Sequence, residues 1–164
     1  MRDVLDGLFL ASTVGAVRAA LAGQKVPGAS DVVVVGDERL ARALANEGVG
    51  VVAVVEGESR IRRHRAAVVG QPHSIPLPDQ GAAAVVGTGA VGADGIACVA
   101  EWSRLVRDGG TIVLVDRGAA AVASRRALAG GLSNIEQRTA GRVVVTSGSV
   151  NALVPDRPRG EPLA

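Results

Sequence analysis

Aromatic side chains are almost absent from this sequence. Phe9 and Trp102 are its only aromatic residues, and tyrosine does not occur. Proteins that read exposed bases stack them on aromatic rings, so this scarcity argues against a surface of that kind. We therefore expect no specific nucleic-acid partner. The core has to be built from valine, leucine, isoleucine and alanine instead.

Cysteine, histidine and lysine are also scarce. With one cysteine, Cys98, the chain cannot form an internal disulfide framework, and with two histidines it is poor in metal ligands. We expect no metal, and we expect Cys98 to be a small buried helix residue. Lys25 is the only lysine, so arginine supplies nearly all the positive charge. The net charge is only +2 despite a pI of 9.4, which is not typical of a polyanion-coating protein.

Long hydrophobic runs are missing as well. The most apolar stretch near the N-terminus, 4–21, is interrupted by Asp6 and Arg18, so it falls short of the ~20 apolar residues that a membrane span needs. A signal peptide would begin with positive charge, yet Arg2 is followed at once by Asp3. We expect no membrane span and a cytoplasmic location.

The same stretch has helical periodicity. Apolar side chains recur every three to four residues, at Leu10, Val14, Val17 and Leu21. This spacing predicts a broad amphipathic helix that packs on the rest of the domain or on a partner. Its apolar character makes a protein partner or a homo-oligomer plausible.

The remaining sequence alternates strands and helices. Its composition, 48% hydrophobic and 21% charged with a mean hydropathy of +0.29, is that of a folded chain, and 164 residues suit one domain. We predict strands at 31–35, 51–55, 66–69, 82–86, 111–115, 135–139 and 143–146, and helices at 37–46, 96–106 and 119–128. We also predict a short helix or turn at 59–65 and a turn at 108–110.

This alternation predicts an α/β fold with a doubly wound, mostly parallel sheet, because strand–helix–strand units are right-handed crossovers. Gly141 separates the last two strands, which suggests a terminal antiparallel pair. We expect residues 1–30 to form a helix that acts as a lid or partner contact. Residues 31–150 then form the main domain, and 151–164 a flexible, proline-rich tail.

Two segments carry a resemblance to a known family. Residues 101–115 read EWSRLVRDGGTIVLV, and 74–79 read SIPLPD before a predicted strand. These segments resemble the E-x-x-R-V-L-x-P-G-G-x-L segment and the LPFPD loop of class I S-adenosylmethionine (SAM)-dependent methyltransferases, with Asp108 in place of the usual proline. The resemblance implies that family's Rossmann-like, seven-stranded sheet with one antiparallel strand inserted at the end.

The resemblance also assigns cofactor-binding positions. The family's acidic-x-G-x-G-x-G loop is reduced here to Gly36 and Asp37 followed by side chains, which an ordinary capped strand-to-helix turn also explains. Glu56 stands where the family's acidic residue accepts hydrogen bonds from ribose hydroxyls, and a solvated surface glutamate is the alternative. Gln71 stands where the adenine amino group is met. SAM is the cofactor implied by these positions.

No clear catalytic base follows from the sequence. Residues 87–92 read GTGAVG, without the Asp/Asn-Pro-Pro-Tyr/Phe motif of amino-group methylation. His73 and Asp79 are the nearest candidates for proton removal. Methyl transfer does not strictly need a base, because alignment of the reacting atoms supplies much of the catalysis.

The densest positive run is the arginine patch formed by Arg60, Arg62, Arg63 and Arg65. On a helix, Arg62 and Arg65 would share one face, and Arg60 and Arg63 a neighbouring one. Such a patch suits a phosphate or an acidic partner. A solvated helix balanced by nearby glutamates is the alternative.

Three functions remain open on this basis. The first is a methyltransferase-like domain with a degenerate cofactor loop that serves as a non-catalytic binding or assembly subunit. The second is an active SAM-dependent methyltransferase acting on a small molecule or a protein. The third is a dinucleotide-binding Rossmann module, which is disfavoured because no G-x-G-x-x-G follows the first strand.

Overall fold

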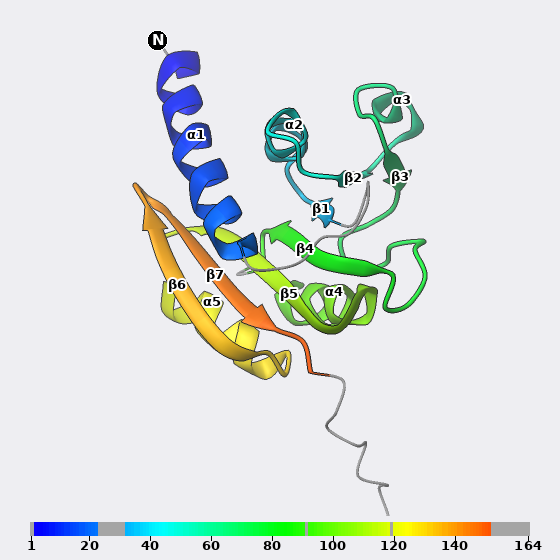
Figure 1. The fold of residues 1–164 in the computed structure, drawn as a ribbon, viewed down its shortest axis with the longest axis vertical. Helices are drawn as coiled ribbons and strands as arrows, with labels where there is room; N and C mark the ends of the chain where they lie inside the picture. The colour runs from blue at the N-terminus through cyan, green and yellow to red at the C-terminus, as the bar shows by residue number, and fades with distance from the viewer. Residues whose placement is uncertain (1, 23–31, 91, 119, 152–164) are drawn as a thin grey trace, which may run out of the picture.

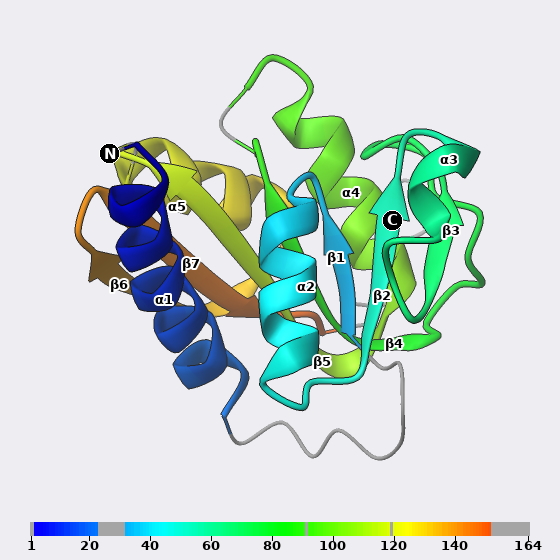
Figure 2. The same ribbon diagram turned by 90° about the horizontal axis from the view of Figure 1, so that it is seen from above.

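The computed structural model describes residues 2–22, 32–90, 92–118 and 120–151, with side chains from Phe9 onward. The predicted tail therefore lies outside the described residues except for Asn151, as do Asp31 and most of the segment between the first helix and the first strand. Seven strands form one sheet in the order β3-β2-β1-β4-β5-β7-β6, with helices on both faces (Figures 1 and 2).

The elements follow the predicted order along the chain. The helices are α1 (Arg2–Leu21), α2 (Glu38–Asn46), α3 (Glu58–Ile61), α4 (Gly95–Leu105) and α5 (Ala120–Ala129). The strands are β1 (Val32–Val35), β2 (Val51–Val55), β3 (Ala67–Val69), β4 (Ala82–Thr88), β5 (Val106–Arg117), β6 (Ser133–Ala140) and β7 (Val143–Ser149).

Strand β1 shows why the sheet is buried on both faces. All four of its valines are at most 3% exposed. Val32 and Val34 join one core with α1 and α2, whereas Val33 and Val35 join the other core with α4 and α5. A continuous β-branched run is what a strand covered on both faces requires.

The sheet is parallel from β3 to β5, and β7 runs antiparallel between β5 and β6. The predicted terminal antiparallel pair and the inserted antiparallel strand are therefore confirmed. Strands β1 and β4 are neighbours in the sheet, and the direction in which successive strands are added to the sheet reverses between them. Ligands of open α/β sheets bind at such a switch point, beyond the carboxyl ends of the strands.

The predicted helix near the N-terminus is confirmed, and it packs on the domain. Val14, Val17 and Leu21 are buried against the core beside α2. An exposed ion pair of 3.0 Å joins Arg18 on α1 to Glu47, just beyond α2. Helices α1 and α2 consequently cover the same face of the sheet (Figure 2).

Two local predictions were wrong. The segment 108–110 is not a turn that precedes a strand, because β5 already begins at Val106. Gly109 has a φ of +75°, which accommodates the irregular register there. Hydrogen bonds of 2.8 and 2.9 Å between Gly109, Gly110 and Val150 hold this irregular stretch beside the residue that follows β7.

The second wrong prediction is the sharing of helical faces within the arginine patch, whereas the segment 59–65 itself is the short helix or turn that the sequence predicts. Helix α3 ends at Ile61, so Arg62, Arg63 and Arg65 lie beyond it and do not share helical faces. Strand β4 is also longer than predicted. It includes Gly87 and Thr88, because both pair with β5.

Candidate functional site

The turn after β1 lies directly against the end of β4. Gly36 has a φ of +88°, and a Cβ atom at this position would lie 2.3 Å from the Thr88 hydroxyl oxygen. That hydroxyl donates a 3.5 Å hydrogen bond to the Val35 carbonyl. Glycine is therefore required here by the close approach of two strands, independently of any ligand.

Asp37 caps helix α2. Its Oδ1 accepts hydrogen bonds from the backbone N–H groups of Arg39, at 2.9 Å, and Leu40, at 3.0 Å. Free N–H groups at a helix N-terminus often bind the anionic group of a ligand. In this protein the Asp37 carboxylate already occupies two of them, so the predicted alternative of a capped turn is what the structure shows.

A cleft of about 500 Å³ opens beside this turn, at the carboxyl ends of β1 and β2. We call it the cationic cleft. Its size is typical of small-molecule sites. The residues that line it come from β1, β2, α2 and the segments that follow β2 and β3, and they are Val35, Gly36, Asp37, Glu38, Arg39, Arg42, Val54, Val55, Glu56, Arg60, Arg63, Gly70 and Pro72.

Glu38 organises one wall of the cationic cleft. Its carboxylate accepts a 2.8 Å hydrogen bond from Arg60 and lies 3.4 Å from the Nε2 atom of His64. Burial raises the pKa of Glu38, but the hydrogen bonds with Arg60 and His64 outweigh it, and the pKa lies below its ordinary value. This cluster ties α2 to the segment that begins with α3.

Other charged side chains of the cleft are not engaged in this way. Within the described part of the chain, no hydrogen bond or ion pair holds the side chain of Arg42, Arg63 or Glu56. All three are exposed.

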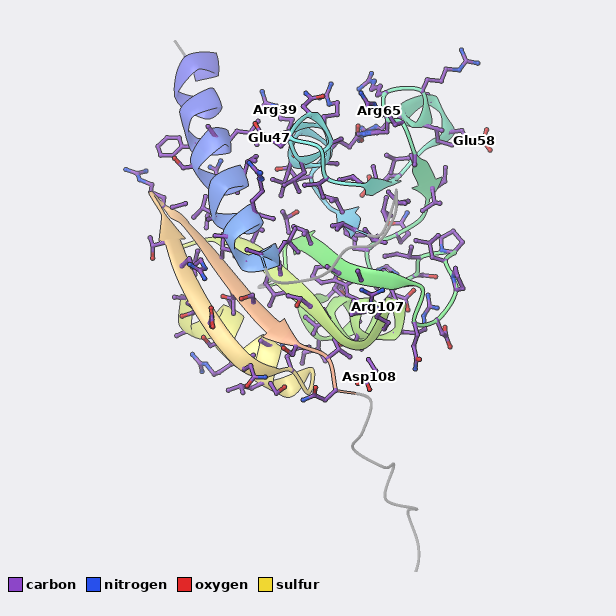
Figure 3. All side chains as sticks on the ribbon, viewed as in Figure 1. Arg39, Glu47, Glu58, Arg65, Arg107 and Asp108 are labelled. Atoms are coloured by element: carbon purple, nitrogen blue, oxygen red, sulfur yellow. The ribbon has the colours of Figure 1, made fainter. Side chains whose placement is uncertain are left out.

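Figure 3 shows Arg39 and Arg65 close to α2 and α3, and Arg107 and Asp108 far from them beside β5.

A second cavity of about 400 Å³ lies between α1 and the carboxyl ends of β4 and β5. We call it the α1 cavity. Asp116, near the end of β5, lines it and is only 5% exposed. Asp37 and Arg39 line both cavities, so the two meet at the start of α2.

Sequence reasoning missed Asp116 and Arg42. Asp116 directly follows the buried run 111–115. An acidic residue at the carboxyl end of a parallel strand is a usable signal for a site residue. Arg42 carried no such signal, because it is one of several charges on α2.

The structure places the other predicted residues outside both cavities. Gln71 is exposed and forms a small bridge with Ser74, although its neighbours Gly70 and Pro72 line the cationic cleft. His73 is exposed in the same loop. Asp79 pairs with Arg104 before the amino end of β4, at the sheet edge opposite the site. Arg62 and Arg65 do not line the cleft.

The segment that resembled a family motif anchors the loop before β4. The Arg104 guanidinium donates hydrogen bonds to the Ile75 and Leu77 carbonyls, each at 2.9 Å, and to both oxygens of Glu101. Glu101 also accepts a 2.8 Å bond from the Ile75 N–H. The hydrogen bonds from Arg104 lower the pKa of Glu101. This E-x-x-R pair therefore has a structural role.

The described ranges contain neither a cluster of metal-binding side chains nor a helix that could cross a membrane. No three metal-binding side chains gather within residues 2–22, 32–90, 92–118 and 120–151. In the same part of the chain, no helix combines the length and apolar character that a membrane crossing demands.

Comparisons with known proteins identify the fold. No protein-family model and no curated protein sequence matches the chain. Several solved structures do match it. A SAM-dependent methyltransferase from Thermotoga maritima, a candidate histamine N-methyltransferase, aligns with a TM-score of 0.64 and 14% identity over 87% of this chain and 89% of its own.

Two further structures are similar. Geranyl diphosphate C-methyltransferase from Streptomyces coelicolor, solved with Mg²⁺, geranyl diphosphate and S-adenosylhomocysteine (SAH), aligns with a TM-score of 0.63 and 14% identity over 85% of this chain and 79% of its own. A candidate methyltransferase in complex with the Trm112 methyltransferase activator of Haloferax volcanii aligns with a TM-score of 0.61 and 16% identity, over 82% and 88%. At these identities the likeness shows the fold alone.

Proposed function

We propose that this chain, which has the fold of class I SAM-dependent methyltransferases as its motifs predicted, is a methyltransferase-like binding domain that does not transfer methyl groups. The single observation that carries this proposal is that side chains, and not a glycine loop, occupy the start of α2. There Asp37 occupies two backbone N–H groups, and Arg39 lies at the junction of both cavities.

The ribose half of SAM fits the residues that line the cationic cleft. Glu56 stands at the end of β2 and lines the cationic cleft, where its two carboxylate oxygens can accept hydrogen bonds from a ribose diol.

The methionine half of SAM does not fit. Residues 37–40 all carry side chains, so the backbone cannot approach a ligand as a glycine loop does. Arg39, Arg42, Arg60 and Arg63 all line the cleft. Because SAM bears a positively charged sulfonium, guanidinium groups at this place oppose its binding.

In this proposal, residues 31–150 form the binding domain and residues 1–30 supply the helix that covers the α1 cavity or contacts a partner. An assembly role has one parallel among the similar structures, since the Haloferax volcanii protein is seen in complex with an activator protein. The partner of this chain would be another protein or a second copy of the chain.

Calorimetric titration with SAM and with SAH tests the proposal. We expect no binding of either compound at micromolar concentrations. Micromolar binding that Glu56→Ala abolishes and Glu58→Ala leaves intact would contradict the proposal. Glu58 is a matched control because it is an exposed glutamate close to Glu56 that does not line the cleft.

A second candidate function is an active methyltransferase, and the α1 cavity favours it. This cavity adjoins the cationic cleft and carries the buried carboxylate of Asp116. A methyl acceptor bound there would have a carboxylate beside it that can hold or take its proton. The same titration decides between the candidates, since this one requires SAM to bind.

A further inference from the structure

The cationic cleft holds more positive charge than its own acidic groups neutralise. Asp37 is committed to the cap of α2, and Glu38 is committed to Arg60 and His64. Arg42 and Arg63 are left without an ionic partner in the described part of the chain. These two guanidinium groups can therefore bind an anionic group of a ligand, with the Glu56 carboxylate as the remaining acidic side chain of the cleft.

The two arginines are brought together from separate elements. Arg42 lies on α2, whereas Arg63 follows α3. The Glu38–Arg60 pair, with His64 only 4% exposed at its side, joins these elements at a fixed separation. The elements that carry the two arginines are thus joined at one cleft before any ligand arrives, although the exposed guanidinium groups themselves are ordered only on binding.

Glu56 adds a second requirement. A carboxylate in the same cleft repels a bare phosphate, but it accepts hydrogen bonds from a pair of hydroxyl groups. A ligand that suits the whole lining needs both a diol and an anionic group. Guanidinium groups recognise phosphate oxygens with bidentate geometry. A ribose that carries a phosphate has both features, and the cleft volume of about 500 Å³ accommodates a small molecule.

We infer that the cationic cleft binds a nucleoside monophosphate, with the Glu56 carboxylate on the ribose hydroxyls and the Arg42 and Arg63 guanidinium groups on the phosphate. The inference rests on the proposed binding function and names the chemical class of its ligand. With Phe9 and Trp102 as the only aromatic residues, the base is held without aromatic stacking. We accordingly expect little preference among bases.

The test is calorimetric titration of the full chain with four probes: the 5′-monophosphates of adenosine and of uridine, adenosine itself and inorganic phosphate. We expect the monophosphates to bind at least about tenfold more tightly than adenosine or phosphate, because only they satisfy both ends of the cleft. Affinity falls as the salt concentration rises from low to physiological values.

Variants separate the named residues from general surface charge. Arg42→Gln and Arg63→Gln each weaken monophosphate binding about tenfold or more, which corresponds to the loss of one charge-assisted contact. Arg62→Gln is the matched control, because Arg62 is an exposed neighbour outside the cleft. Glu56→Gln weakens binding of the monophosphates and strengthens binding of inorganic phosphate, which a non-specific cationic patch would not explain.

Three results would overturn the inference. They are the absence of monophosphate binding up to millimolar concentrations, equal affinity for inorganic phosphate and the monophosphates, and an Arg62→Gln effect as large as that of Arg63→Gln. The outcome is independent of the SAM titration. Tight SAM binding would refute the non-catalytic function, whereas these titrations decide whether the cleft recognises a phosphorylated ribose.

Discussion

Replacement of Arg104 by glutamine should destabilise the fold far more than replacement of an ordinary surface arginine. The Arg104 guanidinium holds the carbonyls of Ile75 and Leu77, both oxygens of Glu101 and one oxygen of Asp79. In the variant, Glu101 loses its counter-ion although its side chain is only 14% exposed.

The magnitude follows from these exposures. Removing one partner of a fully buried pair costs roughly 3–5 kcal/mol. The Arg104 side chain is 33% exposed, so water replaces part of what is lost. The exposed Asp79 carboxylate adds little. We therefore expect the free energy of unfolding to fall by about 2–4 kcal/mol. Arg62→Gln, at an exposed site without such contacts, should change it by less than about 0.5 kcal/mol.

The assay is urea unfolding followed by the fluorescence of Trp102, the single tryptophan. This residue is fully buried, and its indole N–H donates a 2.9 Å hydrogen bond to the Pro72 carbonyl in the anchored loop. A double-mutant cycle with Glu101→Gln should give a coupling energy of about 1–3 kcal/mol.

The effect of Arg104→Gln should also depend on pH. In the folded protein the pKa of Glu101 lies below its ordinary value of 4.5, chiefly because of the hydrogen bonds from Arg104. A lowered folded-state pKa contributes stability above the unfolded-state pKa, and that contribution is lost as the pH falls through the folded-state pKa. The difference between wild type and variant should therefore shrink from pH 7 to below pH 4.5. A difference below about 0.5 kcal/mol at pH 7, or one that is equal at both pH values, would refute the reasoning.

Other predictions concern single positions. Gly87→Ala should cost about 1–3 kcal/mol in urea unfolding, because a Cβ atom would lie 2.3 Å from the Trp102 ring. Gly57→Ala, with no atom within 4 Å, should change stability by less than about 0.5 kcal/mol, and an equal cost at both positions would contradict the packing. Asp37→Ala should cost about 1 kcal/mol by removing the cap of α2, whereas Asp37→Asn should retain most of it; equal losses would argue against the cap. Burial raises the pKa of the Cys98 thiol. It should react with a disulfide reagent at neutral pH only after unfolding, and rapid reaction of the native protein would show the burial to be wrong.

Local sequence patterns predicted the strands and helices well where burial is uniform. The valine run of β1 and the run in β2 could form nothing but strands covered on both faces. The turn at 108–110 and the shared helical faces of the arginine patch were wrong for a common reason. Local composition reveals neither the hydrogen bonds that join Val150 to Gly109 and Gly110 nor the point at which α3 ends before the arginines.

The residues of the candidate site also differ in how far the sequence could predict them. Gly36, Asp37 and Glu56 were predictable because they lie within two residues of the end of a buried strand, and such positions of parallel strands meet at one sheet edge. Asp116 was missed although it follows the buried run 111–115 in the same way. Arg42 was not predictable, since its part in a cavity depends on what packs beside it.

The amino-acid sequence alone thus determined the fold class, through the alternation of β-branched runs with capped helices and through segments that the fold needs for turns and buried strands. Only the tertiary structure decided which charges meet. Arg42 and Arg63 lie 21 positions apart in the sequence, and they share a cleft because α2 packs over β2 and Glu38 ties it to Arg60. Charge pairing depends on distance in space, and that distance is set by packing between elements rather than by any local preference of the chain.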